Sequence, residues 1–157
     1  MNDIVDSLWA MLGRRDGRID PSSHSLTLAD LSREDAPLIY VNRGFEKMTG
    51  YRPADVVGRN CRFLQGPETD RAATAKIRRA LKLGEPLIID ILNYRKDASP
   101  FWNRLSLRPV LGPGGSPRFC IGIQTDITRM RELEERMFGY ATELVTGRKQ
   151  AEQAQDS

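Results

Sequence analysis

The sequence predicts one α+β domain in which helices lie on one face of a five-stranded antiparallel sheet. Two short strand-like segments come first, a glycine-punctuated helical stretch follows, and three longer strand-like segments complete the domain. The chain has 157 residues, of which 39% are hydrophobic, and this is enough for a single core. Amphipathic helical extensions are expected at both ends of this domain.

The N-terminal segment is expected to be an appendage of the core. Apolar residues recur on one helical face between residues 2 and 13, and these are Ile4, Val5, Leu8, Trp9 and Leu12. Gly17 and Pro21 indicate a linker after this helix. We therefore divide the chain into a helical cap with linker over 1–22, a core over 23–127 and a C-terminal helical extension over 128–157.

Two short strands and one clear helix make up the first half of the core. Leu26 and Leu28 alternate with smaller residues in the first strand, and residues 38–41 form the second. The helix begins after Asp70, a favourable N-cap residue. It ends before Gly84, because glycine suits the left-handed position that follows a helix.

Three longer strands are predicted over 87–94, 101–110 and 118–125. Turn-forming residues at 97–99 and 112–115 separate them. Because these connections are short, the three strands are expected to form an antiparallel meander.

One face of this meander carries three carboxamides. Asn93, Asn103 and Gln124 each share a strand face with apolar or small residues, and Gly122 lies beside Gln124. Buried carboxamides need partners, so they either bond one another or line a pocket for a flat polar heterocycle. The opposite faces are largely apolar and need a cover, for which the two extensions and a second copy of the chain are candidates.

A short heptad-like stripe marks the C-terminal extension, and its members are Met130, Leu133, Met137, Tyr140 and Leu144. It predicts a helix that packs either on a partner helix or on the sheet of its own chain.

Charge and composition exclude several classes of protein. The net charge of +3 is too small to indicate nucleic-acid binding, and no apolar run approaches the length of a membrane span. The two cysteines, Cys61 and Cys120, are too few for a disulfide scaffold, and the single histidine argues against a metal site. Without a recognisable targeting signal, the expected location is the cytoplasm.

The most specific motif is Gly58–Gly66, with the sequence GRNCRFLQG. Taken alone, it is a donor-rich turn in which arginines flank the Cys61 thiol. Nearby positive charge favours a reactive thiolate, whereas burial would make the same cysteine inert.

Further stretches extend this motif along the chain, at 40–45, 48–51, 67–70, 76–78, 92–94, 101–103 and 121–124. Together they resemble LOV (light-oxygen-voltage) domains, the flavin-binding blue-light sensors of the PAS fold. The resemblance covers roughly residues 25–127. It implies that the core is a flavin-binding sensor.

The resemblance also implies roles for individual residues. Cys61 would form a reversible thioether adduct with the flavin ring after blue-light excitation, while Arg62 and Arg78 would hold the phosphate. FMN is the expected cofactor, with FAD as an option if the far end of the pocket is open. The remaining expected contacts are polar ones from Asn60, Gln65, Asn93, Asn103 and Gln124, apolar ones from Leu28, Val41, Leu64, Leu105 and Leu107, and one from Gly122.

Gln124 is expected to respond to the adduct. Adduct formation protonates a ring nitrogen and turns it from acceptor to donor, and a facing carboxamide stays paired by reversing its orientation. The strand that carries Gln124 leads into the C-terminal helix, so the change could bias helix docking or dimerisation.

These inferences predict a sensory module and not an enzyme, because no cluster of His, Ser or carboxylate residues indicates a substrate site. Output is expected through a light-dependent homodimer or a separate effector protein, with neither nucleic acid nor membrane as a partner. The main alternative is a light-independent flavin redox sensor, and Cys61 argues against it because that role needs no thiol. A flavoenzyme and a PAS interaction domain without cofactor are further alternatives.

Overall fold

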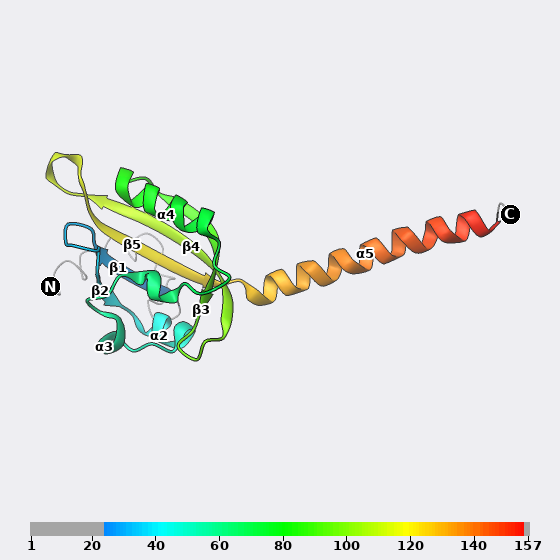
Figure 1. Ribbon diagram of the computed structural model, residues 1–157, viewed down its shortest axis with the longest axis horizontal. Helices are drawn as coiled ribbons and strands as arrows, with labels where there is room; N and C mark the ends of the chain where they lie inside the picture. Colours follow the sequence, from blue (N-terminus) through cyan, green and yellow to red (C-terminus); the bar gives the residue numbers. More distant parts are fainter. Residues whose placement is uncertain (1–23, 156–157) are drawn as a thin grey trace, which may run out of the picture. The chain divides into compact units, whose positions relative to one another are not determined.

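The computed structural model describes residues 24–155. The predicted N-terminal helix over residues 2–13 lies outside this range. Five antiparallel strands form one sheet in the order β2-β1-β5-β4-β3 (Figure 1). They are β1 (Ser25–Asp30), β2 (Leu38–Val41), β3 (Leu87–Tyr94), β4 (Pro100–Leu111) and β5 (Pro117–Asp126). The predicted α+β architecture is confirmed.

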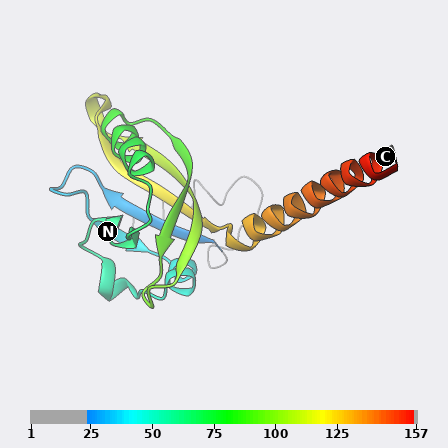
Figure 2. The same ribbon diagram turned by 45° about the vertical axis from the view of Figure 1, so that its right-hand side comes forward.

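Four helices of the described core lie between β2 and β3 in the chain. They are α2 (Arg43–Thr49), α3 (Pro53–Val56), the 3₁₀ helix η1 (Cys61–Leu64) and α4 (Arg71–Leu83). The helices α2 and α3 contact β1 and β2 respectively, and α4 contacts β3 and β5 (Figures 1 and 2). A second 3₁₀ turn, η2 (Pro113–Gly115), joins β4 to β5.

The meander forms as predicted, and its register brings the three carboxamides together. Asn103 of β4 is opposite Ile91 of β3, and Leu105 of β4 is opposite Gln124 of β5. Because side chains alternate between the two faces of a strand, Asn93, Asn103 and Gln124 share the face that the helices cover.

Both ends of α4 follow the sequence signals. The Asp70 side chain accepts a hydrogen bond from the backbone N–H of Ala72, 2.9 Å away. Gly84 has φ = 67°, a left-handed conformation that glycine adopts without strain, and its N–H reaches the carbonyls of Ala80 and Leu81. These two caps set where α4 begins and ends.

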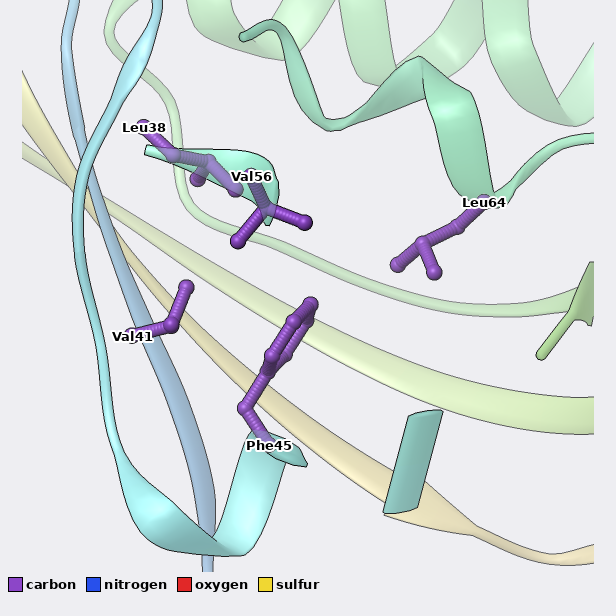
Figure 3. Close-up of a cluster of buried hydrophobic side chains, with 5 residues drawn as sticks. All are labelled: Leu38, Val41, Phe45, Val56 and Leu64. Carbon is purple, nitrogen blue, oxygen red and sulfur yellow. The ribbon is translucent and has the colours of Figure 1, made fainter. Parts of the chain in front are cut away.

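An apolar cluster anchors the helical layer to β2. Its buried members are Leu38, Val41, Phe45, Val56 and Leu64, and Figure 3 shows them converging from β2, α2, α3 and η1. Phe45 is completely buried. Because Leu64 is the last residue of η1, this cluster fixes the short helix that carries Cys61.

The C-terminal helix α5 (Thr128–Gln155) belongs to a second unit, which begins at Ile127. The predicted stripe is on its surface, since Met130, Leu133, Met137, Tyr140 and Leu144 are all exposed. Within residues 24–155, no helix combines the length and apolar content that crossing a membrane requires.

Candidate functional site

A cavity lies between the helical layer and the covered face of the sheet. It brings together most of the residues predicted for the site, namely Asn60, Cys61, Arg62, Leu64, Gln65, Asn93, Asn103, Leu105, Leu107, Gly122 and Gln124. Its walls come from β1, β3, β4, β5, η1 and α4, so chain segments distant in sequence meet around it. It is mostly apolar with a few convergent polar groups, as small-molecule sites usually are.

Two asparagines on neighbouring strands form a linked pair in this cavity. The Asn103 side-chain Nδ2 donates to Oδ1 of Asn93 at 2.9 Å. Oδ1 of Asn103 is buried and has no hydrogen-bond partner among the described residues. A buried acceptor without a partner is costly, so this geometry suits a ligand that presents an N–H or O–H donor.

Gln124 is held from strand β1. Its Oε1 accepts a hydrogen bond from Ser25 Oγ at 2.6 Å, and its Nε2 donates to Thr27 Oγ1 at 3.0 Å. All three side chains are buried. The sequence interpretation missed Ser25 and Thr27, although the same alternation that produced Leu26 and Leu28 assigns both hydroxyls to the other face of β1.

Gly122 leaves room for this arrangement. A Cβ at this position would lie 2.5 Å from Thr27 Oγ1 and 3.0 Å from Gln124 Nε2. The first distance is shorter than real contacts allow. Position 122 therefore has to lack a side chain if Thr27 and Gln124 are to keep these positions at the cavity wall.

Cys61 begins η1 and lines the cavity. The preceding residue, Asn60, caps this helix by accepting a hydrogen bond from the N–H of Arg62 at 2.9 Å. Burial raises the pKa of the Cys61 thiol to about 12, so the thiol is neutral at physiological pH.

The arginines that flank Cys61 are engaged elsewhere. Arg62 forms an ion pair with Asp35, and the guanidinium of Arg59 lies 4.8 Å from the ring centroid of Phe63. The isolated motif left two possibilities for Cys61, a thiol activated by nearby positive charge and a buried, inert thiol. Because both arginines have other partners, the structure does not support the first. Desolvation dominates at this thiol.

A second, more open cleft adjoins the cavity. Its volume is about 500 Å³, and it shares Asn60, Arg62 and Gln65 with the cavity. Arg78 lines this cleft and not the cavity, so the two arginines predicted to bind phosphate meet at the outer end of the site. Arg33 and Lys82 also line this cleft, together with the Asp35 carboxylate that pairs with Arg62.

Two predicted wall residues are corrected by the structure. Leu28 is opposite Ile121 and packs with it and Leu26 on the other face of the sheet, because the alternation of β1 turns Thr27 and Ala29 toward the cavity instead. Val41 is part of the cluster around Phe45 and does not line the cavity. Both residues were predicted to contact the cofactor, and neither lines the cavity.

The second cysteine also lines the cavity. Cys120 is buried, and burial raises the pKa of its thiol to about 12. It lies on β5 and has none of the capped 3₁₀ geometry that positions Cys61.

Comparison with known proteins assigns the fold to a family. The PAS domain family matches residues 25–129, and the chain therefore belongs to this family. A solved LOV domain from the blue-light activated histidine kinase of Erythrobacter litoralis EL346 is 47% identical, with a TM-score of 0.65. That match covers 70% of this chain and 99% of the solved domain, so within the PAS family the chain is a LOV domain.

Longer relatives contain the same domain. Phototropin-2 of Oryza sativa is 48% identical over 108 residues, which are 69% of this chain and 12% of the relative. Blue-light-activated histidine kinase 2 of Erythrobacter litoralis is 50% identical over 103 residues, which are 66% of this chain and 30% of the relative. The chain thus spans less than a third of the length of either protein.

A second similar solved structure is the light-state dimer of the fungal blue-light photoreceptor Vivid. It is 29% identical, with a TM-score of 0.67, and the match covers 79% of this chain and 94% of that one.

Proposed function

We propose that this protein is a blue-light photoreceptor whose cavity holds a flavin. The observation that carries the proposal is a neutral cysteine thiol in the same cavity as three buried carboxamides, one of which has an unpaired acceptor atom. Membership of the LOV domains supports it, because the matching relatives include blue-light-activated histidine kinases.

Different residues along the cavity would bind different parts of the flavin. Asn93, Asn103 and Gln124 would hydrogen-bond the polar edge of the ring, with Leu64, Leu105 and Leu107 packing on its faces. Asn60 and Gln65 would bond the chain that leads outward, where Arg62 and Arg78 would hold a phosphate. A single phosphate between two arginines favours FMN, and the open cleft beyond leaves space for FAD.

A bound flavin would supply the absorption of blue light and an electrophilic ring carbon to which a thiol can add. The chain would supply the sulfur and its proton, both from Cys61, because this thiol is neutral before illumination. Holding the thiol in the cavity makes its reaction effectively unimolecular. Gln124 would then reverse its carboxamide and stay paired when a ring nitrogen changes from acceptor to donor.

The proposed output is a change in self-association. The exposed stripe on α5 would pack against a second copy of the chain, with a separate effector protein as the other possible recipient. In this scheme 1–22 is a helical cap, 23–127 is the sensor core and 128–157 is the signalling helix. The sensor itself would perform no catalysis beyond its own photochemistry, and its proposed location is the cytoplasm.

Cysteine substitution with a matched control tests the proposal. We expect purified protein to absorb blue light with vibronic structure and to bleach reversibly on illumination. Cys61→Ala should keep the colour and lose the bleaching, whereas Cys120→Ala, which removes the other thiol of the same cavity, should keep both. Absorption spectra recorded before, during and after illumination provide the measurement.

Two results would contradict the proposal. Protein that cannot be loaded with any flavin would exclude the cofactor. Bleaching that survives in Cys61→Ala would exclude adduct formation and favour the light-independent redox sensor.

A further inference from the structure

Gln124 is held by two hydroxyl groups on one strand. Ser25 and Thr27 of β1 pair with Gln124 and Gly122 of β5 across the sheet. The Gln124 side chain therefore lies beside its direct neighbour Ser25 and leans diagonally toward Thr27, and it hydrogen-bonds to both. All three side chains are buried, with exposed fractions of 2%, 4% and 3% for Ser25, Thr27 and Gln124.

The present hydrogen bonds have a direction. Ser25 donates to the carboxamide oxygen, and the carboxamide nitrogen donates to Thr27. The Thr27 hydroxyl uses its own hydrogen in a long contact of 3.4 Å to the carbonyl of Gly122. The oxygen and the nitrogen of Gln124 thus each have one partner on β1.

Hydroxyl groups can reverse this pattern and keep both hydrogen bonds to the carboxamide. A hydroxyl both donates and accepts, so a carboxamide turned by half a rotation would find Ser25 as an acceptor and Thr27 as a donor. Backbone groups in the same places could serve only one orientation, and reversal would then leave buried polar atoms unpaired. The weak contact from Thr27 to Gly122 is the main bond given up.

We infer that Ser25 and Thr27 are positioning residues that hold Gln124 in its dark orientation and make its reversal reversible. This inference rests on the proposed photoreceptor function. The sequence predicted the response to the adduct for Gln124 of β5 alone, whereas here two residues of β1 contribute to it. Ser25 acts through Gln124, since it does not line the cavity. Thr27 lines the cavity as well, and its proposed role is the hydrogen bond that it accepts from Gln124.

Two substitutions at Thr27 separate this role from a structural one. Thr27→Val keeps the shape of the side chain and removes the hydroxyl, whereas Thr27→Ser keeps the hydroxyl and removes a methyl group. We expect Thr27→Val to change the rate of thermal recovery after a light pulse by about two- to tenfold, the effect of one hydrogen bond. Thr27→Ser should recover within about twofold of the wild type, and Ser25→Ala should resemble Thr27→Val.

A second measurement does not depend on photochemistry. In uniformly ¹⁵N-labelled protein, with or without flavin, the side-chain NH₂ resonances of Gln124 should move in Thr27→Val and stay in place in Thr27→Ser. Wild-type recovery together with unmoved resonances in Thr27→Val would overturn the inference. Absence of bleaching in the wild type would instead reject the proposed function, and the resonances would still test the role of Thr27.

Discussion

At the scale of single residues, burial and not neighbouring charge sets the state of Cys61. Arg59 precedes the Asn60–Cys61 pair and Arg62 follows it. Arg62 pairs with Asp35, however, and Arg59 stacks on Phe63. Desolvation is then the dominant influence and raises the pKa of the thiol to about 12. A neutral thiol is a weak nucleophile, so in the proposed mechanism Cys61 does not react with the flavin in darkness.

A substitution at Gly122 tests how closely Thr27 and Gln124 are packed. In Gly122→Ala the new methyl group would meet Thr27 Oγ1 at 2.5 Å, so Thr27 or Gln124 must move. We expect overpacking to destabilise the protein by about 1–3 kcal/mol and to lower the ratio of bound flavin to protein. Urea unfolding and absorption spectra provide the two measurements.

Gly139→Ala is the matched control for this substitution. A Cβ at Gly139 of α5 would meet nothing within 4 Å, so helix propensity alone applies there. It should stabilise the helix by about 0.5–1 kcal/mol and leave flavin binding unchanged. Equal effects of the two substitutions would show that the packing at Gly122 has no special importance.

At the scale of elements, α3 is short and depends on one carboxylate. Asp55 Oδ2 accepts a hydrogen bond from the backbone N–H of Arg52 at 2.9 Å and another from Lys96 Nζ at 3.0 Å. Lys96 lies in the turn between β3 and β4, so this carboxylate ties that turn to α3. The backbone hydrogen bond from Arg52 is the largest cause that lowers the pKa of Asp55, to about 2.

This lowered pKa predicts a pH dependence of stability. The ordinary pKa of 3.8 applies to the unfolded chain, so the unfolded state binds more protons between that value and about 2. The stabilising contribution of Asp55 is therefore present above the unfolded pKa and is lost as the pH falls through the folded pKa. We expect Asp55→Asn to show a smaller fall in melting temperature between about pH 5 and pH 2 than the wild type.

Thermal unfolding followed by circular dichroism across this pH range gives the comparison. Glu134→Gln in α5 serves as the control for the loss of one carboxylate. If Asp55→Asn and the wild type lost melting temperature in parallel on acidification, the assigned role of Asp55 would be wrong.

At the scale of the whole molecule, the stripe on α5 is the surface proposed for self-association. Leu133 and Leu144 are 46% and 73% exposed, and large apolar side chains in a row on a helix favour packing against another helix. We expect the protein to form a dimer whose stability differs between darkness and light. Leu133→Glu should weaken it at least tenfold, because a charge would be buried in the interface.

Analytical ultracentrifugation in darkness and under blue light measures this effect. Thr142→Glu introduces the same charge nine residues further on, which is the opposite side of the helix, and should leave the dimer intact. A monomer at high concentration in both conditions would exclude the proposed dimer.

Much of the core could be predicted because local sequence controls it. Asp70 and Gly84 bound α4 through backbone capping, which depends only on adjacent residues. The strands of the meander follow from alternation and short turns, and their shared face brought Asn93, Asn103 and Gln124 together as expected.

The face that each strand presents could not always be predicted. Alternation divides β1 into two faces, and its leucines suggested that the apolar one lined the pocket. Pairing with β5 instead buries Leu28 beside Ile121 and turns Thr27 toward Gln124. Which face meets the cavity depends on the position of β1 within the sheet, and strand order is a property of the complete fold.

The sequence by itself determined the order of the elements, the ends of α4 and the presence of a thiol among carboxamides, because each depends on neighbouring residues or on strand alternation. Only the tertiary structure decided that this thiol is neutral, that Arg62 pairs with Asp35, and that hydroxyls from β1 hold Gln124. These properties depend on burial and on contacts between residues up to 99 positions apart, as for Ser25 and Gln124, and local pattern contains no information about either.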